Sequence, residues 1–144
     1  MLEDGASKDL FLRCQNVWLD PPGRFASKSL LIRKGRIFAI GQYSDSPPTD
    51  GSVTTVDLGA YYLLPGLINT HVHLEFSASS APLGELLNES PNERLLRACR
   101  NANQMLRSGV TTARDCGSSL ELLALARRPD LHPCALPRLL LSGP

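Results

Sequence analysis

The order of the segments after residue 62 constrains the fold of this chain more than any other feature. An apolar run from Leu63 to His73 is predicted to form a strand, and two further strands are predicted at 110–115 and 138–142. Helical patterns separate these three segments. Strands that alternate with helices imply right-handed crossovers and a parallel sheet. We therefore expect an α/β fold in residues 63–144, with the order strand, helix, strand, helix, strand.

The first helix has a defined start and end. Ser90 is expected at the N-cap, Pro91 at the first helical position, and Glu93 completes a capping box. Gly109 ends the helix at the position that glycine favours. The preceding segment 76–89 is rich in Ser, Ala, Pro and Gly and is predicted to be a loop.

The second helix is predicted from a similar signal. Ser118 and Glu121 have the spacing of another capping box, and leucines and alanines follow as far as two arginines. Pro129 then stops the helix.

Residues before the Leu63 strand predict a small β module. Residues 1–9 are polar and expected to be loose, and a strand starts at Leu10. Segment 29–41 predicts a hairpin with a tight reversal at 33–36, where a glycine supplies the positive φ that such turns need. A polar loop and a short strand at 53–58 follow.

Two histidines at the end of the Leu63 strand are the candidate metal ligands. His71 and His73 project from the same side of a strand, while Val72 points the other way. Two neutral imidazoles held in this way can share a divalent metal such as zinc. The same spacing also occurs in strand ends that bind nothing, and His132 is the one other histidine in the chain.

Composition restricts the kinds of binding partner and the cellular compartment that can be expected. A net charge of +1, with scattered basic residues, argues against a nucleic-acid binder. No run of eighteen apolar residues suggests a membrane span, and the acidic start does not resemble a signal peptide. Four widely spaced cysteines favour free thiols in a reducing cytosol. We therefore expect a cytoplasmic protein with no nucleic-acid or membrane partner.

The segment 64–74, LPGLINTHVHL, resembles the first barrel strand of the metal-dependent amidohydrolase superfamily. Asn69 stands where an Asp is usual, at a position that precedes the ligands. Segments 35–41 and 56–59 resemble the hairpin and the V-D-L-G run of the small β-sandwich that precedes the barrel in this superfamily. Segment 101–117 resembles the second barrel strand of its imidazolonepropionase and prolidase-like branch.

The resemblance implies two domains and a reaction. Residues 1–62 would be N-terminal strands of the β-sandwich, and residues 63–144 the first units of an incomplete (β/α)₈ TIM barrel. The implied activity is hydrolysis of a carbon–nitrogen bond in an amide or cyclic amidine-like small molecule by metal-activated water. The implied cofactor is a divalent metal, zinc above all, with His71 and His73 among its ligands. A homo-oligomeric state is compatible with this prediction.

Other polar residues near the strand ends are weaker candidates. Asp115 and Arg114 could orient substrate, although a salt bridge or a helix-cap contact is an equal alternative. Glu75 is expected to be a solvated loop carboxylate, His132 a surface residue, and Cys116 a small residue packed beneath a helix start.

Chain length sets the remaining alternatives. A complete barrel takes about 200 to more than 400 residues, so the 144 residues here are expected to be an N-terminal fragment that is inactive alone. The alternatives are a truncated isoform, a non-catalytic binding or assembly module, or a small α/β protein with a fortuitous histidine pair.

Overall fold

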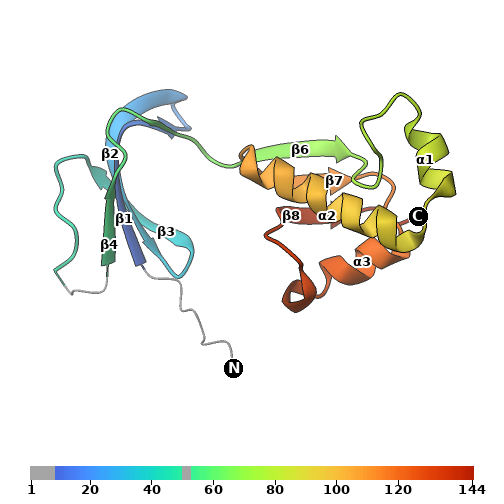
Figure 1. The fold of residues 1–144 in the computed structure, drawn as a ribbon. Coiled ribbons are helices and arrows are strands. Elements are labelled where there is room, and N and C mark those ends of the chain that lie inside the picture. Colours follow the sequence, from blue (N-terminus) through green and yellow to red (C-terminus); the bar gives the residue numbers. More distant parts are fainter. Residues whose placement is uncertain (1–8, 50–52) are drawn as a thin grey trace. The chain divides into compact units, whose positions relative to one another are not determined.

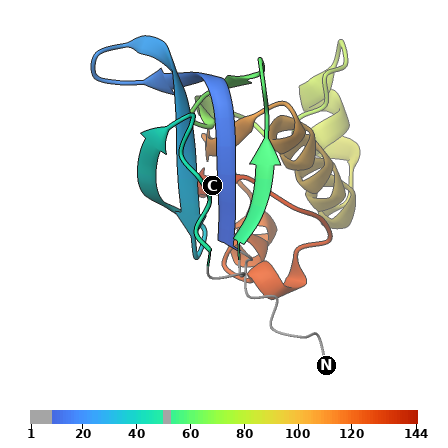
Figure 2. The same cartoon turned by 90° about the vertical axis from the view of Figure 1, so that its left-hand side faces the viewer.

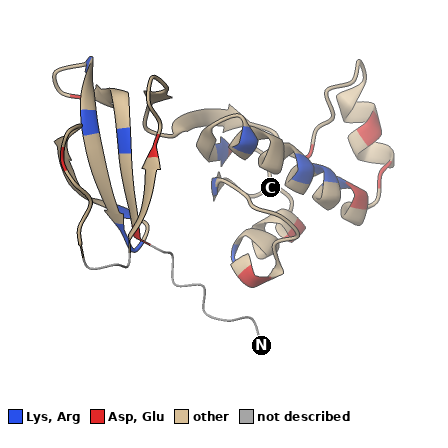
Figure 3. Cartoon of the chain, turned by 60° about the vertical axis from the view of Figure 1, so that its left-hand side comes forward, with Lys and Arg blue, Asp and Glu red and all other residues tan. Residues whose placement is uncertain are grey.

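The computed structural model describes residues 9–49 and 53–144, which form two compact units that divide between Pro65 and Gly66 (Figure 1). The segment 1–8 and the last three residues, 50–52, of the loop predicted before the 53–58 strand lie outside the described residues. Within the described ranges, no helix is long and apolar enough to cross a membrane. Figure 3 shows Lys and Arg interspersed with Asp and Glu in both units.

The first unit contains a five-stranded sheet (Figure 2). Its strands are β1 (Asp9–Leu19), β2 (Arg24–Arg33), β3 (Arg36–Gln42), β4 (Val53–Asp57) and β5 (Tyr62–Leu63). The order is β3-β2-β1-β4, and β5 also pairs with β1. The β1–β2 and β2–β3 pairs are antiparallel, whereas β4 and β5 run parallel to β1.

The hairpin between β2 and β3 confirms the predicted reversal. Arg33 pairs with Arg36, and the two residues between them, Lys34 and Gly35, have φ values of 50° and 71°. Two positive φ values in a two-residue loop match the right-handed twist of the flanking strands.

The second unit has three parallel strands in the order β6-β7-β8, with helices between them. The strands are β6 (Leu67–Val72), β7 (Val110–Asp115) and β8 (Arg138–Leu141); the helices are α1 (Pro82–Asn88), α2 (Pro91–Arg107), α3 (Leu120–Ala126) and the 3₁₀ turn Pro129–Leu131. The core consists of Leu74, Ala98, Ala102 and Leu122, which pack where α2 and α3 meet the sheet. The predicted strand and helix order is confirmed.

The start of α2 also confirms the prediction. The Ser90 hydroxyl accepts from the Glu93 N–H at 3.4 Å, and the Ser90 N–H donates to Glu93 Oε2 at 2.9 Å. The Ser90 hydroxyl also donates to Glu93 Oε2 at 2.7 Å, and this bond, followed by the one from the Ser90 N–H, lowers the pKa of Glu93. Gly109 follows the helix with φ of 91°.

Two helix predictions need correction. Helix α1 lies in the segment predicted to be a loop; it begins at Pro82 and buries no residue. Helix α3 begins one residue later than expected because its N-cap is Ser119, whose hydroxyl accepts from the Leu122 N–H at 3.2 Å. Ser118 does not cap because its hydroxyl donates to Asp115 at 3.0 Å.

The predicted Leu63 strand is divided in the structure. Leu63 belongs to β5 and pairs with Val17 in the first unit, and β6 starts only at Leu67. The division into units therefore falls between Pro65 and Gly66 rather than before Leu63. A side chain at Gly66 would overlap the Thr111 side chain of β7, so only glycine lets the chain enter the sheet here.

Candidate metal site

The two histidines lie side by side at the end of β6. His71 is the penultimate residue of the strand and His73 follows its last residue, Val72. Their Nε2 atoms are 3.3 Å apart, and both side chains are exposed. Two nitrogens that each lie about 2.0–2.1 Å from one tetrahedral zinc ion are separated by about 3.3–3.4 Å. The pair therefore fits the spacing of two ligands on one metal.

An irregularity in β6 sets the direction of His71. Asn69 pairs with Ala113 and Val72 with Asp115, so two residues of β6 face a single residue of β7. Asn69 Oδ1 accepts from the His71 N–H at 3.1 Å within this bulge. Bulges of this kind commonly re-aim a side chain. Asn69 therefore acts on the main chain of the first histidine.

His73 has contacts on one face and one edge of its ring. The Phe76 ring stacks on it, with centroids 5.2 Å apart and an interplanar angle of 28°. The Phe76 N–H donates to the His73 carbonyl at 3.2 Å and closes a turn. A Cβ atom on Gly117 would lie 3.3 Å from His73 Nδ1, so glycine leaves room beside that nitrogen.

Asp115 is fully buried and bonded to the loops that follow β6 and β7. Oδ2 accepts from the Leu74 N–H at 2.7 Å, and Oδ1 accepts from the Gly117 N–H and the Ser118 hydroxyl, both at 3.0 Å. Its carboxylate thus holds the chain just after His73. Arg114 is exposed on the opposite face of β7, so alternation separates these two sequence candidates.

Glu75 differs from the expectation of a solvated carboxylate. Its side chain is 6% exposed, and its Oε1 accepts from the Ser119 hydroxyl. The Arg97 guanidinium of α2 donates to the Glu75 carbonyl at 3.1 Å. The prediction was wrong because α3 starts beside this loop, so the hydroxyl that caps α3 also reaches the carboxylate.

Asn101 is a residue that sequence reasoning missed. Its side-chain N–H₂ donates to the Leu74 carbonyl at 2.8 Å and to the Phe76 carbonyl at 3.1 Å. A signal was present in the sequence: Asn101 is a polar residue next to Ala102 on the helix face that the apolar spacing predicts to be buried.

The remaining histidine and the cysteines take no part in the pair. His132 is half-buried, with a ring nitrogen 3.2 Å from the Leu125 carbonyl. All four cysteines are free, and burial, followed by the nearby Cys134, raises the pKa of the Cys99 thiol. Cys116 is half-buried. Among residues 9–49 and 53–144, no group of three or more His, Cys, Asp or Glu side chains converges as a metal site.

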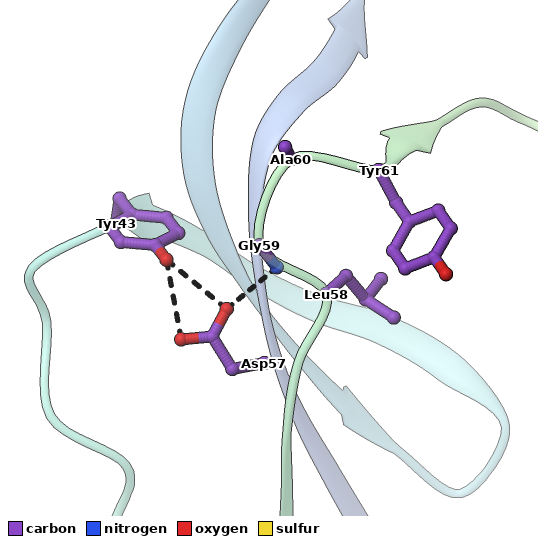
Figure 4. A pocket seen from close by; sticks show the side chains of 6 residues that line it. All are labelled: Tyr43, Asp57, Leu58, Gly59, Ala60 and Tyr61. Carbon is purple, nitrogen blue, oxygen red and sulfur yellow. Dashed lines mark hydrogen bonds between the residues drawn. The ribbon is translucent and has the colours of Figure 1, made fainter.

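The first unit has a hollow of about 540 Å³ beside the V-D-L-G run (Figure 4). Asp57 lies in it, with Oδ1 accepting from the Gly59 N–H at 2.8 Å and from the Tyr43 hydroxyl at 3.1 Å. The carboxylate therefore closes a turn and tethers the loop after β3. No histidine or cysteine lines this hollow.

Comparison with known proteins identifies the family. The sequence profile of the amidohydrolase family matches residues 62–142, more than half of the chain and nearly all of the second unit. The chain belongs to the amidohydrolase family.

Individual relatives match most of this chain but a small part of their own. An imidazolonepropionase of Klebsiella pneumoniae is 36% identical over 107 residues, which cover 74% of this chain and 24% of the relative. A 5-methylthioadenosine/S-adenosylhomocysteine deaminase of Syntrophobacter fumaroxidans is 34% identical over 112 residues, 65% of this chain and 25% of the relative. The chain thus spans about a quarter of the length of these relatives.

Solved structures share the fold. A prolidase crystallised with N-methylphosphonate-L-proline superposes with a TM-score of 0.76 at 21% identity, over 94% of this chain and 32% of the prolidase. The α/β fold expected from sequence is therefore confirmed.

Proposed function

We propose that these residues form part of the active site of a metal-dependent hydrolase that cleaves a carbon–nitrogen bond in a small-molecule substrate. His71 and His73 are two ligands of a divalent metal, zinc by the preference of that ion for imidazole nitrogen. The observation that carries the proposal is the 3.3 Å separation of the two Nε2 atoms. Family membership supports the reaction class.

The parallel sheet of the second unit supports a barrel. We propose that β6, β7 and β8 are the first strands of a (β/α)₈ barrel and that the first unit is part of a β-sandwich. In such barrels the active site lies at the carboxyl ends of the strands. His71 and His73 lie at that end of β6, and their neighbour Val72 packs on the core, so the histidines project to the face away from the helices.

Two of the chain's residues near the histidines have different proposed roles, one in contact with substrate and one in fixing the main chain. A divalent metal at the pair would lower the pKa of water toward about 7 and polarise a substrate carbonyl. Arg114 is exposed and follows the buried Ala113, so it shares the open face with the histidines and is proposed to orient substrate. Asp115 holds the main chain after His73 instead, because its carboxylate is fully engaged.

Two histidines do not complete a catalytic site. Catalytic zinc typically has three protein ligands and a water molecule, whereas the described residues bring together no group of three or more ligand side chains. We therefore infer that these residues alone are inactive and that further ligands lie outside the described ranges. A non-catalytic module would show the same incomplete set, so metal binding alone does not separate the two functions.

Metal titration tests the histidine pair directly. Cu²⁺ binds nitrogen sites more tightly than Zn²⁺, so two imidazoles give measurable binding in isothermal titration calorimetry of the full chain. We expect one Cu²⁺ component that the double variant His71→Asn, His73→Asn loses, with an unchanged far-UV circular dichroism spectrum because both side chains are exposed. His132→Asn is the matched control and should retain this component.

Equal Cu²⁺ binding by the double variant and the wild type would reject the proposed metal site. Hydrolysis is tested in a longer chain that contains these residues and further β/α units, with a panel of amides and cyclic amidines. Turnover there that survives the double variant would reject the catalytic role.

A further inference from the structure

The turn that follows His73, residues 74–76, is held on all three of its carbonyl oxygens by side chains of α2. The Asn101 amide donates to the carbonyls of Leu74 and Phe76, and Arg97 donates to the carbonyl of Glu75. We propose that Asn101 is a positioning residue that sets the orientation of the His73 ring. The part of this inference that concerns metal affinity rests on the proposed function. The part that concerns the orientation of the His73 ring does not.

The path from the amide to the ring is short. The 2.8 Å bond to the Leu74 carbonyl fixes the residue that follows His73, and the 3.1 Å bond to the Phe76 carbonyl fixes the residue that stacks on the ring. The Phe76 N–H closes the same turn on the His73 carbonyl. One side chain therefore sets the distance between the main chain of His73 and the aromatic ring that covers it.

The opposite side of the turn has a second restraint. The Leu74 N–H donates to Asp115 at 2.7 Å, so this residue is held on its N–H by β7 and on its carbonyl by α2. The two bonds lie on the residue directly after His73. Loss of the Asn101 amide removes the bonds to the Leu74 and Phe76 carbonyls and so loosens the stacking of Phe76 on His73, while the bond from the Leu74 N–H to Asp115 stays. The expected result is a changed orientation of the His73 ring in a second unit that remains folded.

Helix α2 also supplies a matched control. Asn103 lies two residues after Asn101, and its side chain donates to the Ala135 carbonyl at 2.7 Å. This is the same kind of bond from the same helix, but it reaches a loop before β8. A role in general stability predicts similar effects of the two asparagines, whereas a positioning role predicts an effect on His73 from Asn101 alone.

The experiment compares Asn101→Leu and Asn103→Leu with the full wild-type chain. The first measurement is the NMR shift of the His73 ring protons without metal, assigned by His71→Asn and His132→Asn. Asn101→Leu should move the His73 shift toward the value in urea as the Phe76 stack is lost, whereas Asn103→Leu should leave it unchanged. If Asn101→Leu fails to give the helical spectrum of the wild type, Asn101→Ala, which adds no bulk, replaces it.

The second measurement is the affinity of the histidine-dependent Cu²⁺ component. Loss of a partner behind a ligand typically weakens metal binding by about 10–100-fold, so Asn101→Leu should lower the affinity at least about tenfold, and Asn103→Leu should not. A His73 ring shift that is the same in Asn101→Leu and wild type overturns the positioning role, whatever the metal does. A wild-type chain without Cu²⁺ binding rejects the proposed function, while a ring shift specific to Asn101→Leu would still establish the positioning role.

Discussion

Replacement of Asp115 by Asn should destabilise the second unit and leave the first unit unchanged. The wild-type carboxylate accepts from two main-chain N–H groups and one hydroxyl at a site with 0% exposure. An amide has one acceptor oxygen. If that oxygen stays on the Leu74 N–H, the amide N–H₂ faces the Gly117 N–H, whereas the Ser118 hydroxyl can rotate to accept.

The magnitude follows from the lost acceptor. A buried donor without a partner costs about 1–3 kcal/mol, so Asp115→Asn should lower the free energy of unfolding of the second unit by about that amount. A small domain has a total stability of about 5–15 kcal/mol. The substitution would therefore remove a substantial part of it.

The chain contains separate probes for its two units. Every described helix belongs to the second unit, and the single tryptophan, Trp18, lies in β1 of the first. With a urea dependence of about 1–2 kcal/mol per M, a loss of about 1–3 kcal/mol should lower the midpoint of the circular dichroism signal at the helix band by about 0.5–3 M. The Trp18 fluorescence midpoint should not move. Asp130→Asn, an exposed aspartate paired with Arg128, should shift neither.

Either of two results would refute this reasoning. An unchanged helix midpoint in Asp115→Asn would show that leaving the Gly117 N–H without an acceptor costs no net stability. Equal shifts of the helix and fluorescence midpoints would show that the effect is not local to the second unit.

Other substitutions test the backbone and the helix cap. Gly66→Ala should lower the helix midpoint in urea because the added methyl group overlaps the Thr111 side chain. Gly84 lies within α1, and a methyl group added there would meet no other atom, so Gly84→Ala should leave the midpoint unchanged or raise it. Ser90→Ala should flatten the acid dependence of stability. The pKa of Glu93 is lowered in the folded chain by Ser90, so this contribution is complete above the ordinary carboxyl pKa and disappears as pH falls through the lowered value. A difference between Ser90→Ala and wild type that persists unchanged in acid would contradict the assignment.

The order of elements in the second unit could be predicted because its signals are local. Ser90, Pro91 and Glu93 mark the start of α2 within one turn, and Gly109 marks its end. Alternating strands and helices then require a parallel sheet. The candidate ligands could be named for the same reason, since His71 and His73 are two residues apart at the end of one strand.

Features that depend on tertiary contacts could not be predicted in the same way. Glu75 and Ser119 are 44 residues apart, so neither its burial nor its hydroxyl partner is visible in the local sequence. The α3 cap shifted by one residue because Asp115 takes the Ser118 hydroxyl. Helix α1 was missed although Leu83, Leu86 and Leu87 have helical spacing, because the helix has only seven residues and contains Pro82 and Gly84, which are typical of a loop.

The bonds around residues 74–76 act on main-chain atoms, and this makes the side chain at position 73 exchangeable. The Leu74 N–H and the three carbonyls would be held in the same way whatever donor preceded them. A cysteine or an aspartate at that position would be presented from the same strand end, with sulfur or oxygen in place of nitrogen. Because the choice of metal follows the donor type, a change of this one residue would alter the metal preference of the site without moving the main chain that carries the ligand.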